Sequence, residues 1–246
     1  MRTATPAGIR PLAAPASLTV SVIIPTLDEA EELPATLDSV VAAFGPSVEV
    51  IVVDGGSKDR TAELAEKRAV VVRSSPGRGR QLNAGARSAS GDVFLFLHAD
   101  TRLSPEAGAA LGDALSVPNI VGGCFKVALR GPSAGLVIAR MLGAAINLRS
   151  RFFRTATGDQ AIFARRSAFE QAGGYTTDDL FEDVLFYRKL KRLGRVTVLD
   201  PPARTSDRRW RKLGYARTIA THLVLRLMFL AGVSPARVAR LYRRVR

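Results

Sequence analysis

Cysteine is nearly absent from this chain of 246 residues, and long uncharged apolar runs are missing altogether. The single cysteine, Cys124, excludes an internal disulfide framework, and no CxxC pair or Cys/His cluster indicates a zinc site. Arginine interrupts the two nearest candidates for a membrane span, residues 134–148 and 218–236. The sequence therefore predicts a protein of a reducing compartment that is not integral to a membrane.

The first 17 residues also lack the apolar core of a signal peptide, because they mix Ala, Pro and Thr with Arg2 and Arg10. We expect residues 1–17 to form a short disordered leader and the folded part to stay in the cytoplasm. The folded domain is expected over residues 18–210, and residues 211–246 are expected to form basic amphipathic helices.

Positive charge is concentrated in that C-terminal region. The net charge is +14, and residues 203–246 supply eleven Arg and one Lys against a single acid, which leaves only +3 for the rest of the chain. Such a tail favours an anionic surface, either phospholipid or nucleic acid, although a solvated basic face explains it equally well. From Leu213 the apolar residues recur at helical spacing, with Arg217 and Arg226 off the stripe. This helix would lie on the inner face of the plasma membrane or pack on the protein's own sheet.

Apolar runs rich in β-branched residues alternate with helical stripes through the first half of the chain. The runs predict a buried strand over residues 20–24 and further strands over residues 48–53, 69–72 and 92–97. Asp28, Ser57 and Ser104 are expected to cap the helices that follow the first, second and fourth strands. This order predicts an α/β fold with a mostly parallel, Rossmann-like sheet and helices on both faces. The second half is mixed, with strands expected over residues 123–129 and 195–199 and helices near Arg166, Glu182 and Leu213.

Three of the predicted strands end in polar clusters, and ligands of such sheets bind outside the carboxyl ends of the strands. Asp100 follows the most apolar strand, where its carboxylate would hold Mg²⁺ or Mn²⁺ bridging a diphosphate, unless it only caps the next turn. Asp54 would accept hydrogen bonds from a nucleobase or ribose, unless it is an ordinary turn aspartate before two glycines. The clusters are Thr26-Leu27-Asp28-Glu29, Asp54-Gly55-Gly56-Ser57 and His98-Ala99-Asp100.

Five segments resemble, in the same order, those of family 2 glycosyltransferases, which have the GT-A fold. The resemblance covers roughly residues 21–210 and implies a nucleotide-sugar site, a divalent metal and an acceptor-side half. The segments are residues 22–29, 52–61, 78–85 and 91–101, and Gly173-Gly174-Tyr175 followed by Glu182-Asp183.

The resemblance also implies roles for matched positions. Asp100 would hold the metal, and Asp183, next to Glu182, would be the general base that takes the acceptor hydroxyl's proton. Asp183 can equally be a helix N-terminal acid favoured by the helix dipole. The positions expected to contact the nucleotide-sugar are Pro25, Thr26, Asp28, Glu29, Asp54, Gly55, Arg80, Asn83, His98 and Ala99, together with Asp100.

The sequence departs from the family pattern in three places. The usual Asp-x-Asp becomes His98-Ala99-Asp100, and the usual Asn before Glu29 is Asp28. The Gln-x-x-Arg-Trp motif of processive members appears as Ser206-Asp207-Arg208-Arg209-Trp210 without the Gln, which indicates a non-processive enzyme. The His98 variant, with Gly158-Asp159-Gln160, resembles a small bacterial subgroup of short family members. Arg209 would stabilise the departing diphosphate, and Asp159, Gln160 and Trp210 are expected on the acceptor side.

These observations favour an inverting transferase that moves a sugar from a UDP- or GDP-type donor to a small-molecule or lipid-linked acceptor. A basic nucleic-acid-binding protein is the alternative from a different class, but its support is charge alone, because the aromatics are sparse and no nucleic-acid motif is present. A nucleotidyltransferase would need a Gly-rich pyrophosphate loop after the first strand, where this chain has residues 25–29 without glycine. The sequence leaves open the sugar, inversion against retention, and the oligomeric state.

Overall fold

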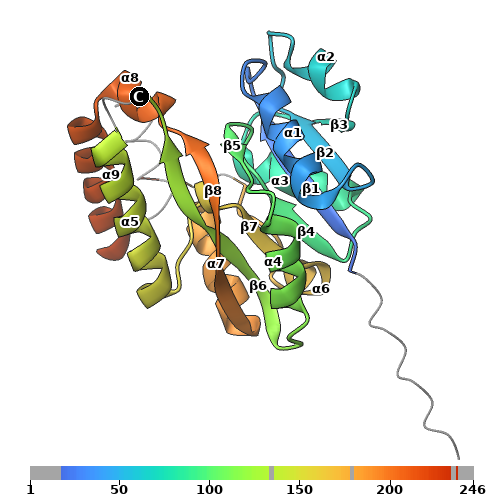
Figure 1. The fold of residues 1–246 in the computed structure, drawn as a ribbon. Helices are drawn as coiled ribbons and strands as arrows, with labels where there is room; N and C mark the ends of the chain where they lie inside the picture. Colours follow the sequence, from blue (N-terminus) through green and yellow to red (C-terminus); the bar gives the residue numbers. More distant parts are fainter. Residues whose placement is uncertain (1–17, 133–135, 178–179, 234–236, 238–246) are drawn as a thin grey trace, which may run out of the picture.

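The computed structural model describes residues 18–132, 136–177, 180–233 and 237 (Figure 1). Its strands form one eight-stranded sheet in the order β3-β2-β1-β4-β7-β6-β8-β5. The strands are β1 (Val20–Thr26), β2 (Glu49–Asp54), β3 (Val70–Arg73), β4 (Val93–Phe96), β5 (Thr101–Arg102), β6 (Ile120–Arg130), β7 (Ile162–Arg165) and β8 (Arg195–Ser206). The helices are α1 (Leu33–Phe44), α2 (Thr61–Glu66), α3 (Arg78–Ser88), α4 (Ala107–Leu115), α5 (Leu136–Phe153), α6 (Arg166–Gln171), α7 (Glu182–Leu193), α8 (Arg208–Leu213) and α9 (Tyr215–Leu230), with a 3₁₀ turn η2 (Gly158–Gln160).

The first half of the sheet is parallel, as the alternation of strands and helices predicts. β1 pairs in parallel with β2 and β4, and β2 pairs in parallel with β3. The second half is mixed, because β7 runs antiparallel to both β4 and β6 while β8 runs parallel to β6. The predicted α/β fold class and the mixed C-terminal half are confirmed.

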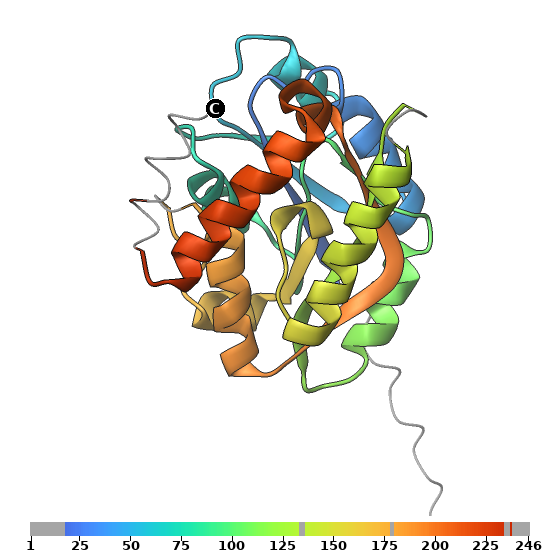
Figure 2. The ribbon, with the colours of Figure 1, turned by 90° about the vertical axis from the view of Figure 1, so that its left-hand side faces the viewer.

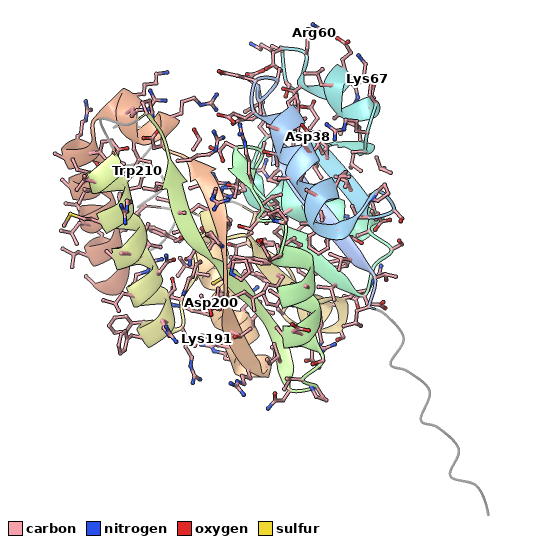
Figure 3. All side chains as sticks on the ribbon, viewed as in Figure 1. Asp38, Arg60, Lys67, Lys191, Asp200 and Trp210 are labelled. Atoms are coloured by element: carbon pink, nitrogen blue, oxygen red, sulfur yellow. The ribbon has the colours of Figure 1, made fainter. Side chains whose placement is uncertain are left out.

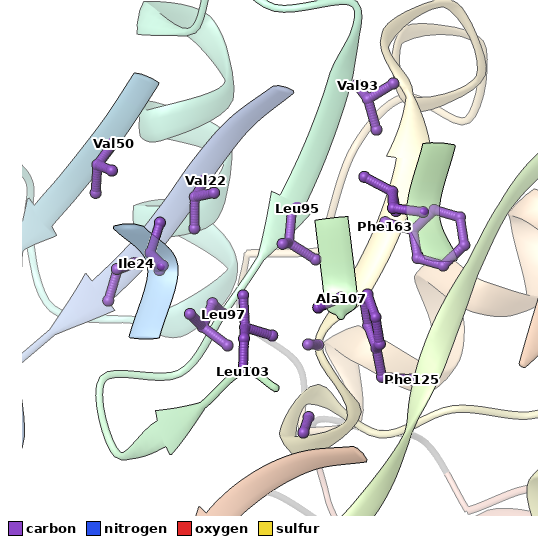
Figure 4. Packing of buried hydrophobic residues seen from close by; sticks show 14 of the residues in the cluster. Val22, Ile24, Val50, Val93, Leu95, Leu97, Leu103, Ala107, Phe125 and Phe163 are labelled. Carbon is purple, nitrogen blue, oxygen red and sulfur yellow. The ribbon is translucent and has the colours of Figure 1, made fainter. Parts of the chain in front are cut away.

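Apolar layers cover both faces of the sheet, because alternate residues of each strand point to opposite sides. Val22 and Ile24 of β1 pack with Leu37 of α1 and Leu111 of α4 in one layer, part of which Figure 4 shows. Ile23 belongs to the second layer, which contains α3, α6 and α7. An aromatic group in this second layer lies directly under the predicted site: Phe96, Phe169, Tyr175 and Phe186, with ring centroids 4.3 to 6.1 Å apart.

The sheet is curled, and the curl depends on the short connection after β4. β5 begins only five residues after β4 ends, yet it pairs antiparallel with β8 at the far end of the strand order. Residues 97–100 therefore cross between the two halves of the sheet. The backbone carbonyl of Asp100 accepts a hydrogen bond from Ser206 N at 3.1 Å, which fixes this crossing.

All three predicted helix caps are wrong, because each polar side chain bonds a group outside the helix that it was expected to cap. Asp28 has a left-handed φ of 54° and accepts a bond from Lys58 N at 2.7 Å, while α1 begins later, at Leu33. Ser57 donates to Asp54, and α2 begins at Thr61. Ser104 donates to the carbonyl of Pro202, and α4 begins at Ala107.

The sequence did not predict α5, β5, β7 or the second half of β8. α5 packs along β6, where the side-chain amide of Asn147 both accepts from Val127 N (2.8 Å) and donates to Val127 O (2.9 Å). In the described part of the chain, no helix is both long and apolar enough to cross a membrane. The predicted leader, residues 1–17, lies outside the described residues, as do residues 234–236 and 238–246 of the predicted C-terminal helices.

Candidate active site

The loops after β1 and β2 are joined at the carboxyl edge of the parallel half-sheet. The carbonyl of Thr26 accepts hydrogen bonds from Gly55 N (2.9 Å) and from Gln81 Nε2 (2.8 Å), and the same Gln81 nitrogen donates to Val53 O (2.8 Å). Gln81 comes from α3, so hydrogen bonds join into one unit the loop after β1, the loop after β2 and α3, which are separate segments of the sequence. Sequence reasoning missed Gln81, although it lies inside the segment 78–85 that carries the family resemblance.

Asp54 lies in this unit and is 4% exposed. Its carboxylate accepts from Gly56 N at 3.1 Å, from Ser57 N at 3.2 Å and from Ser57 Oγ at 2.5 Å. The side chain therefore closes its own turn, as the alternative interpretation of this aspartate expected. Its contact with a nucleobase stays a prediction.

An ion pair closes the same edge from the C-terminal half of the chain. Arg208 Nη2, on α8, lies 2.8 Å from the Glu29 carboxylate, although 179 positions separate the two residues. Burial raises the pKa of Glu29, as do the charges of Asp100 and Glu32, while Arg208 opposes the increase. Sequence reasoning missed Arg208 and selected its neighbour Arg209, whose side chain lies outside what the structure describes.

Asp100 lies half-buried at this acidic edge. Among the described residues, no group of three or more His, Cys, Asp and Glu side chains has the arrangement of a metal site. Mg²⁺ and Mn²⁺ take oxygen ligands, and Mg²⁺ typically binds one or two carboxylates together with substrate phosphates. Asp100 therefore fits an ion shared with a bound diphosphate, and it does not fit a metal that the protein holds alone.

The second acidic group stands at the start of α7. Glu182 and Asp183 are 5% and 9% exposed, and they follow Phe181, which has a left-handed φ of 74°. Glu182 Oε1 lies 3.1 Å from Arg78 Nη1. Asp183 accepts hydrogen bonds from Gly158 N at 2.6 Å and from Val184 N at 2.7 Å.

The environment of Asp183 makes its carboxylate a stronger base. Burial raises the pKa of Asp183 from 3.8 to about 6, and the charge of Glu182 adds to this increase. Arg78 and the two backbone N–H groups oppose it. Sequence reasoning missed Arg78, although the matched segment 78–85 begins with it.

Gly158 brings His98 and Asp183 together. A Cβ atom added at Gly158 would lie 2.5 Å from His98 Nε2 and 3.5 Å from Asp183 Oδ2, so the two side chains occupy the space that a larger residue would fill. A small cavity connects them with Arg78 and Tyr175. The motif after β4 and the acidic pair of α7, separated by more than 80 residues, therefore form one site.

Two residues predicted to contact substrate have hydrogen-bond partners within the fold. The amide of Asn83 donates to Tyr175 O and accepts from Tyr175 N, both at 2.9 Å, and so binds α3 to the Gly-Gly-Tyr turn. Gln160 is fully buried, and its amide bonds Ser150, Thr157 and the carbonyl of Phe125. Gln160 has no exposed surface and links α5, the turn before η2 and β6. Contact of Asn83 and Gln160 with substrate stays a prediction.

The other predicted positions lie around the edge of the site. Asp159 has a buried Oδ1 without a hydrogen-bond partner, and burial, together with the charge of Asp183, raises its pKa. Ala99 is buried, and its carbonyl accepts from Thr36. Arg80 donates to the carbonyl of Pro76. Trp210 stacks on Tyr215 with ring centroids 6.2 Å apart, and in the view of Figure 3 it lies on the opposite side of the molecule from Arg60 and Lys67, which flank α2.

A curled α/β sheet with acidic loops at its carboxyl edge and a buried carboxylate pair facing them has the architecture of the GT-A glycosyltransferases. Residues 21–173 match the profile of Glycosyl transferase family 2, and the chain belongs to this family. This membership supports the transferase hypothesis over the nucleic-acid-binding and nucleotidyltransferase alternatives.

Two curated relatives illustrate the range of the family. The chain is 32% identical over 167 residues to a PGL/p-HBAD biosynthesis glycosyltransferase of Mycobacterium bovis, and the aligned region covers 63% of this chain and 62% of the relative. It is 37% identical over 99 residues to the undecaprenyl-phosphate 4-deoxy-4-formamido-L-arabinose transferase of Pectobacterium carotovorum, and the aligned region covers 35% of this chain and 30% of the relative. The chain thus spans less than two thirds of the length of both relatives.

Solved structures share the fold. The glucosyl-3-phosphoglycerate synthase of Mycobacterium tuberculosis, in complex with Mn²⁺, UDP and glucosyl-3-phosphoglycerate, is 25% identical, with 93% of this chain and 88% of that chain covered and a TM-score of 0.58. TarS of S. aureus, in complex with UDP-GlcNAc, is 21% identical over 77% of this chain and 58% of that chain, with a TM-score of 0.62. The likeness to TarS shows the fold alone.

Proposed function

We propose that this chain is a non-processive, inverting glycosyltransferase that moves a sugar from a nucleotide-diphosphate donor to an acceptor hydroxyl. The observation that carries the proposal is the buried Asp183 carboxylate, whose pKa is raised to about 6 and which lies across Gly158 from His98. A general base works best when its pKa is near the working pH. The family membership and the UDP and Mn²⁺ in the complex of the M. tuberculosis synthase support the same activity.

In the proposed reaction, the acceptor oxygen attacks the anomeric carbon while Asp183 takes the hydroxyl proton. The bond from the anomeric carbon to the diphosphate breaks, and its electron pair leaves with the nucleoside diphosphate, so the configuration inverts. The N–H groups of Gly158 and Val184 orient the base, because each is bonded to a different carboxylate oxygen.

The donor is proposed to bind across the loops after β1, β2 and β4, with Asp100 as the protein ligand of the divalent ion. When bound, that ion would neutralise charge on the departing diphosphate. Thr26, Glu29 and Asp54 keep the nucleotide contacts that the family resemblance implies, and Arg209 keeps its proposed role at the diphosphate. Mg²⁺ and Mn²⁺ are both compatible with a carboxylate and phosphate oxygens.

The acceptor is proposed to be lipid-linked, which would place the enzyme at the inner face of the plasma membrane. Support comes from the P. carotovorum relative, which by name is an undecaprenyl-phosphate transferase. A small soluble acceptor is the alternative within the same activity.

A donor screen tests the proposal. Thermal unfolding is measured with UDP-, GDP- and TDP-sugars, with and without Mn²⁺, because a ligand at a hundred times its Kd stabilises the fold by about 2.7 kcal/mol. We expect one donor class to raise the melting temperature in a metal-dependent way. The anomer that the enzyme releases on slow hydrolysis of that donor, followed by NMR, then distinguishes inversion from retention. Absence of any donor effect would contradict the proposal.

A further inference from the structure

Large apolar side chains are exposed on α5 and α9. Figures 1 and 2 show both helices on the same side of the molecule. Monomeric soluble proteins rarely expose wide apolar surfaces without a binding role. We call this surface the α5/α9 face; its members, 42% to 74% exposed, are Val137, Ile138, Met141, Leu148, Phe152 and Phe153 of α5 and Ile219, Leu223, Val224 and Leu227 of α9.

The polarity of α5 is the reverse of that of an ordinary surface helix. Its inward face consists of small and polar residues: Ala139 and Ser150 are buried, Asn147 bonds Val127 of β6, and a Cβ at Gly143 would lie 3.3 Å from the carbonyl of Val127. Its outward face carries Met141 and Phe152. A helix that packs only against its own domain turns its large apolar residues inward, so the outward face of α5 is suited to a partner.

α9 has the same orientation. Thr218 and Leu225 face inward and are buried, whereas Leu223 and Leu227 are exposed. These last two residues belong to the apolar stripe that the sequence predicts to lie on a membrane or on the protein's own sheet. The stripe does not pack on the sheet.

Charge identifies the partner. Residues 131–158, which contain α5, include four Arg and no acid, and residues 208–246, which contain α9, include ten Arg, one Lys and no acid. Apolar residues flanked by cations characterise helices that lie in a membrane interface, where each basic residue near an anionic leaflet contributes about 1 kcal/mol. A second copy of this chain would present the same positive charge and be repelled. The exposed cations of these two regions include Arg140, Arg151, Arg154, Arg211, Lys212 and Arg217.

The α5/α9 face lies on the acceptor side of the site. The segment around residues 155–165, gold in Figure 2, lies between the two helices in that view, and it contains Gly158, which contacts Asp183. Trp210, between Arg208 and α9, stacks on Tyr215 at the start of α9. A bilayer against this face would therefore lie next to the proposed general base.

We propose that the α5/α9 face docks on an anionic phospholipid bilayer and so presents Asp183 to a hydroxyl of a lipid-linked acceptor. The presentation step rests on the proposed function, whereas the docking step does not. The two helices act as one surface, because neither the apolar side chains nor the cations are confined to the C-terminal tail.

Vesicle co-sedimentation of the full chain tests the docking. We expect binding to vesicles of phosphatidylglycerol and phosphatidylcholine at low salt, weaker binding at high salt, and little binding to phosphatidylcholine alone. The pair Met141→Gln/Phe152→Gln and the pair Leu223→Gln/Leu227→Gln should each weaken binding by about tenfold. The control pair Val70→Gln/Val117→Gln removes exposed apolar residues elsewhere and should leave binding unchanged.

Two results would overturn the docking proposal. One is a wild-type chain that stays in the supernatant with anionic vesicles at low salt. The other is a dimer of the wild type, detected by light scattering, that both variant pairs dissociate while the variants still bind vesicles. The α5/α9 face would then join two copies of the chain. Donor-dependent thermal shifts of the wild type and of the same variants distinguish failure of the docking proposal from failure of the proposed function. If the wild type shows no shift with any donor, the proposed function is contradicted, and the co-sedimentation result still decides the docking proposal.

Discussion

Gly158 N donates a 2.6 Å hydrogen bond to Oδ2 of Asp183, and the missing side chain at Gly158 leaves the space in which His98 lies. The backbone N–H of Gly158 thus orients the proposed base, Asp183. Because Gly158 has no side chain, the His98 ring can pack against it. The arrangement makes the site sensitive to a single added methyl group.

Gly158→Ala should destabilise the fold by about 1–3 kcal/mol, the usual cost of overpacking, because the new Cβ would lie 2.5 Å from His98 Nε2. Urea unfolding of Gly158→Ala, His98→Ala and the double variant measures this. The double variant should recover most of the loss, because the clashing ring is gone. A full loss in both backgrounds would show that the backbone at residue 158, and not the contact with His98, requires glycine.

Asp183→Asn should leave donor binding nearly unchanged and slow transfer by about 10²- to 10⁴-fold, the usual contribution of a positioned general base. Donor-dependent thermal shift and the rate of nucleoside diphosphate release report the two effects separately. Glu182→Gln is the matched control, and its effect should be smaller. If Glu182→Gln gives the large loss and Asp183→Asn gives none, Glu182 is the base.

Transfer should depend on pH through Asp183. Because the pKa of this carboxyl is raised to about 6, kcat/KM should fall as the pH drops below about 6 and the base becomes protonated. Glu182→Gln removes a charge that raises the pKa and should move this limb to lower pH. Arg78→Met removes a charge that lowers it and should move the limb to higher pH. Shifts in the same direction for both variants would contradict this assignment.

Ionisation of the Asp183 carboxyl, which should increase activity as the pH rises, should lower the stability of the fold. A carboxyl whose pKa is raised on folding favours the folded state in its protonated form, so its contribution is present below the unfolded pKa of about 3.9. This contribution is lost as the pH rises through about 6. Asp183→Asn should therefore flatten the pH dependence of the unfolding free energy between about pH 4 and pH 6. A slope equal to that of the wild type would place the raised pKa elsewhere.

Asp100→Ala should abolish the Mn²⁺-dependent part of donor binding and leave the fold intact, because the variant keeps the backbone carbonyl that accepts from Ser206 N of β8. The thermal shift with donor, with and without Mn²⁺, is the measurement. Asp113→Ala, on the exposed side of α4, is the control. Wild-type donor binding by Asp100→Ala would show that the proposed metal ligand is wrong.

Local signals were sufficient to predict the parallel half of the sheet. β-branched runs such as Ile51-Val52-Val53 form the strands of this half, and their order places three polar loops at one edge. The helix caps could not be predicted in this way, because Asp28 and Ser104 bond residues that become neighbours only in the folded chain, and Ser57 Oγ accepts a bond from Asp28 N at 3.0 Å as well as donating to Asp54. α5 was missed because its large apolar residues face outward.

The candidate site was likewise only partly predictable from the sequence. Its donor loops follow from topology and from the family resemblance, since each lies directly after a predicted strand. The proximity of His98, Gly158 and Asp183 depends on how the second half of the sheet curls, and no local pattern encodes that. Arg208 is a further example, because only the folded chain brings it to Glu29.

The crossing after β4 has a consequence for how the chain matures. Thr101 of β5 donates to Thr205 of β8 at 3.0 Å across 104 positions of sequence. At a translation rate of about 5–20 residues per second, the partner strand leaves the ribosome roughly 5–20 seconds after β5. The parallel half-sheet can assemble during this interval, but the loop that carries Asp100 has no strand to hold it. The proposed metal ligand therefore takes its place only after β8 has been made.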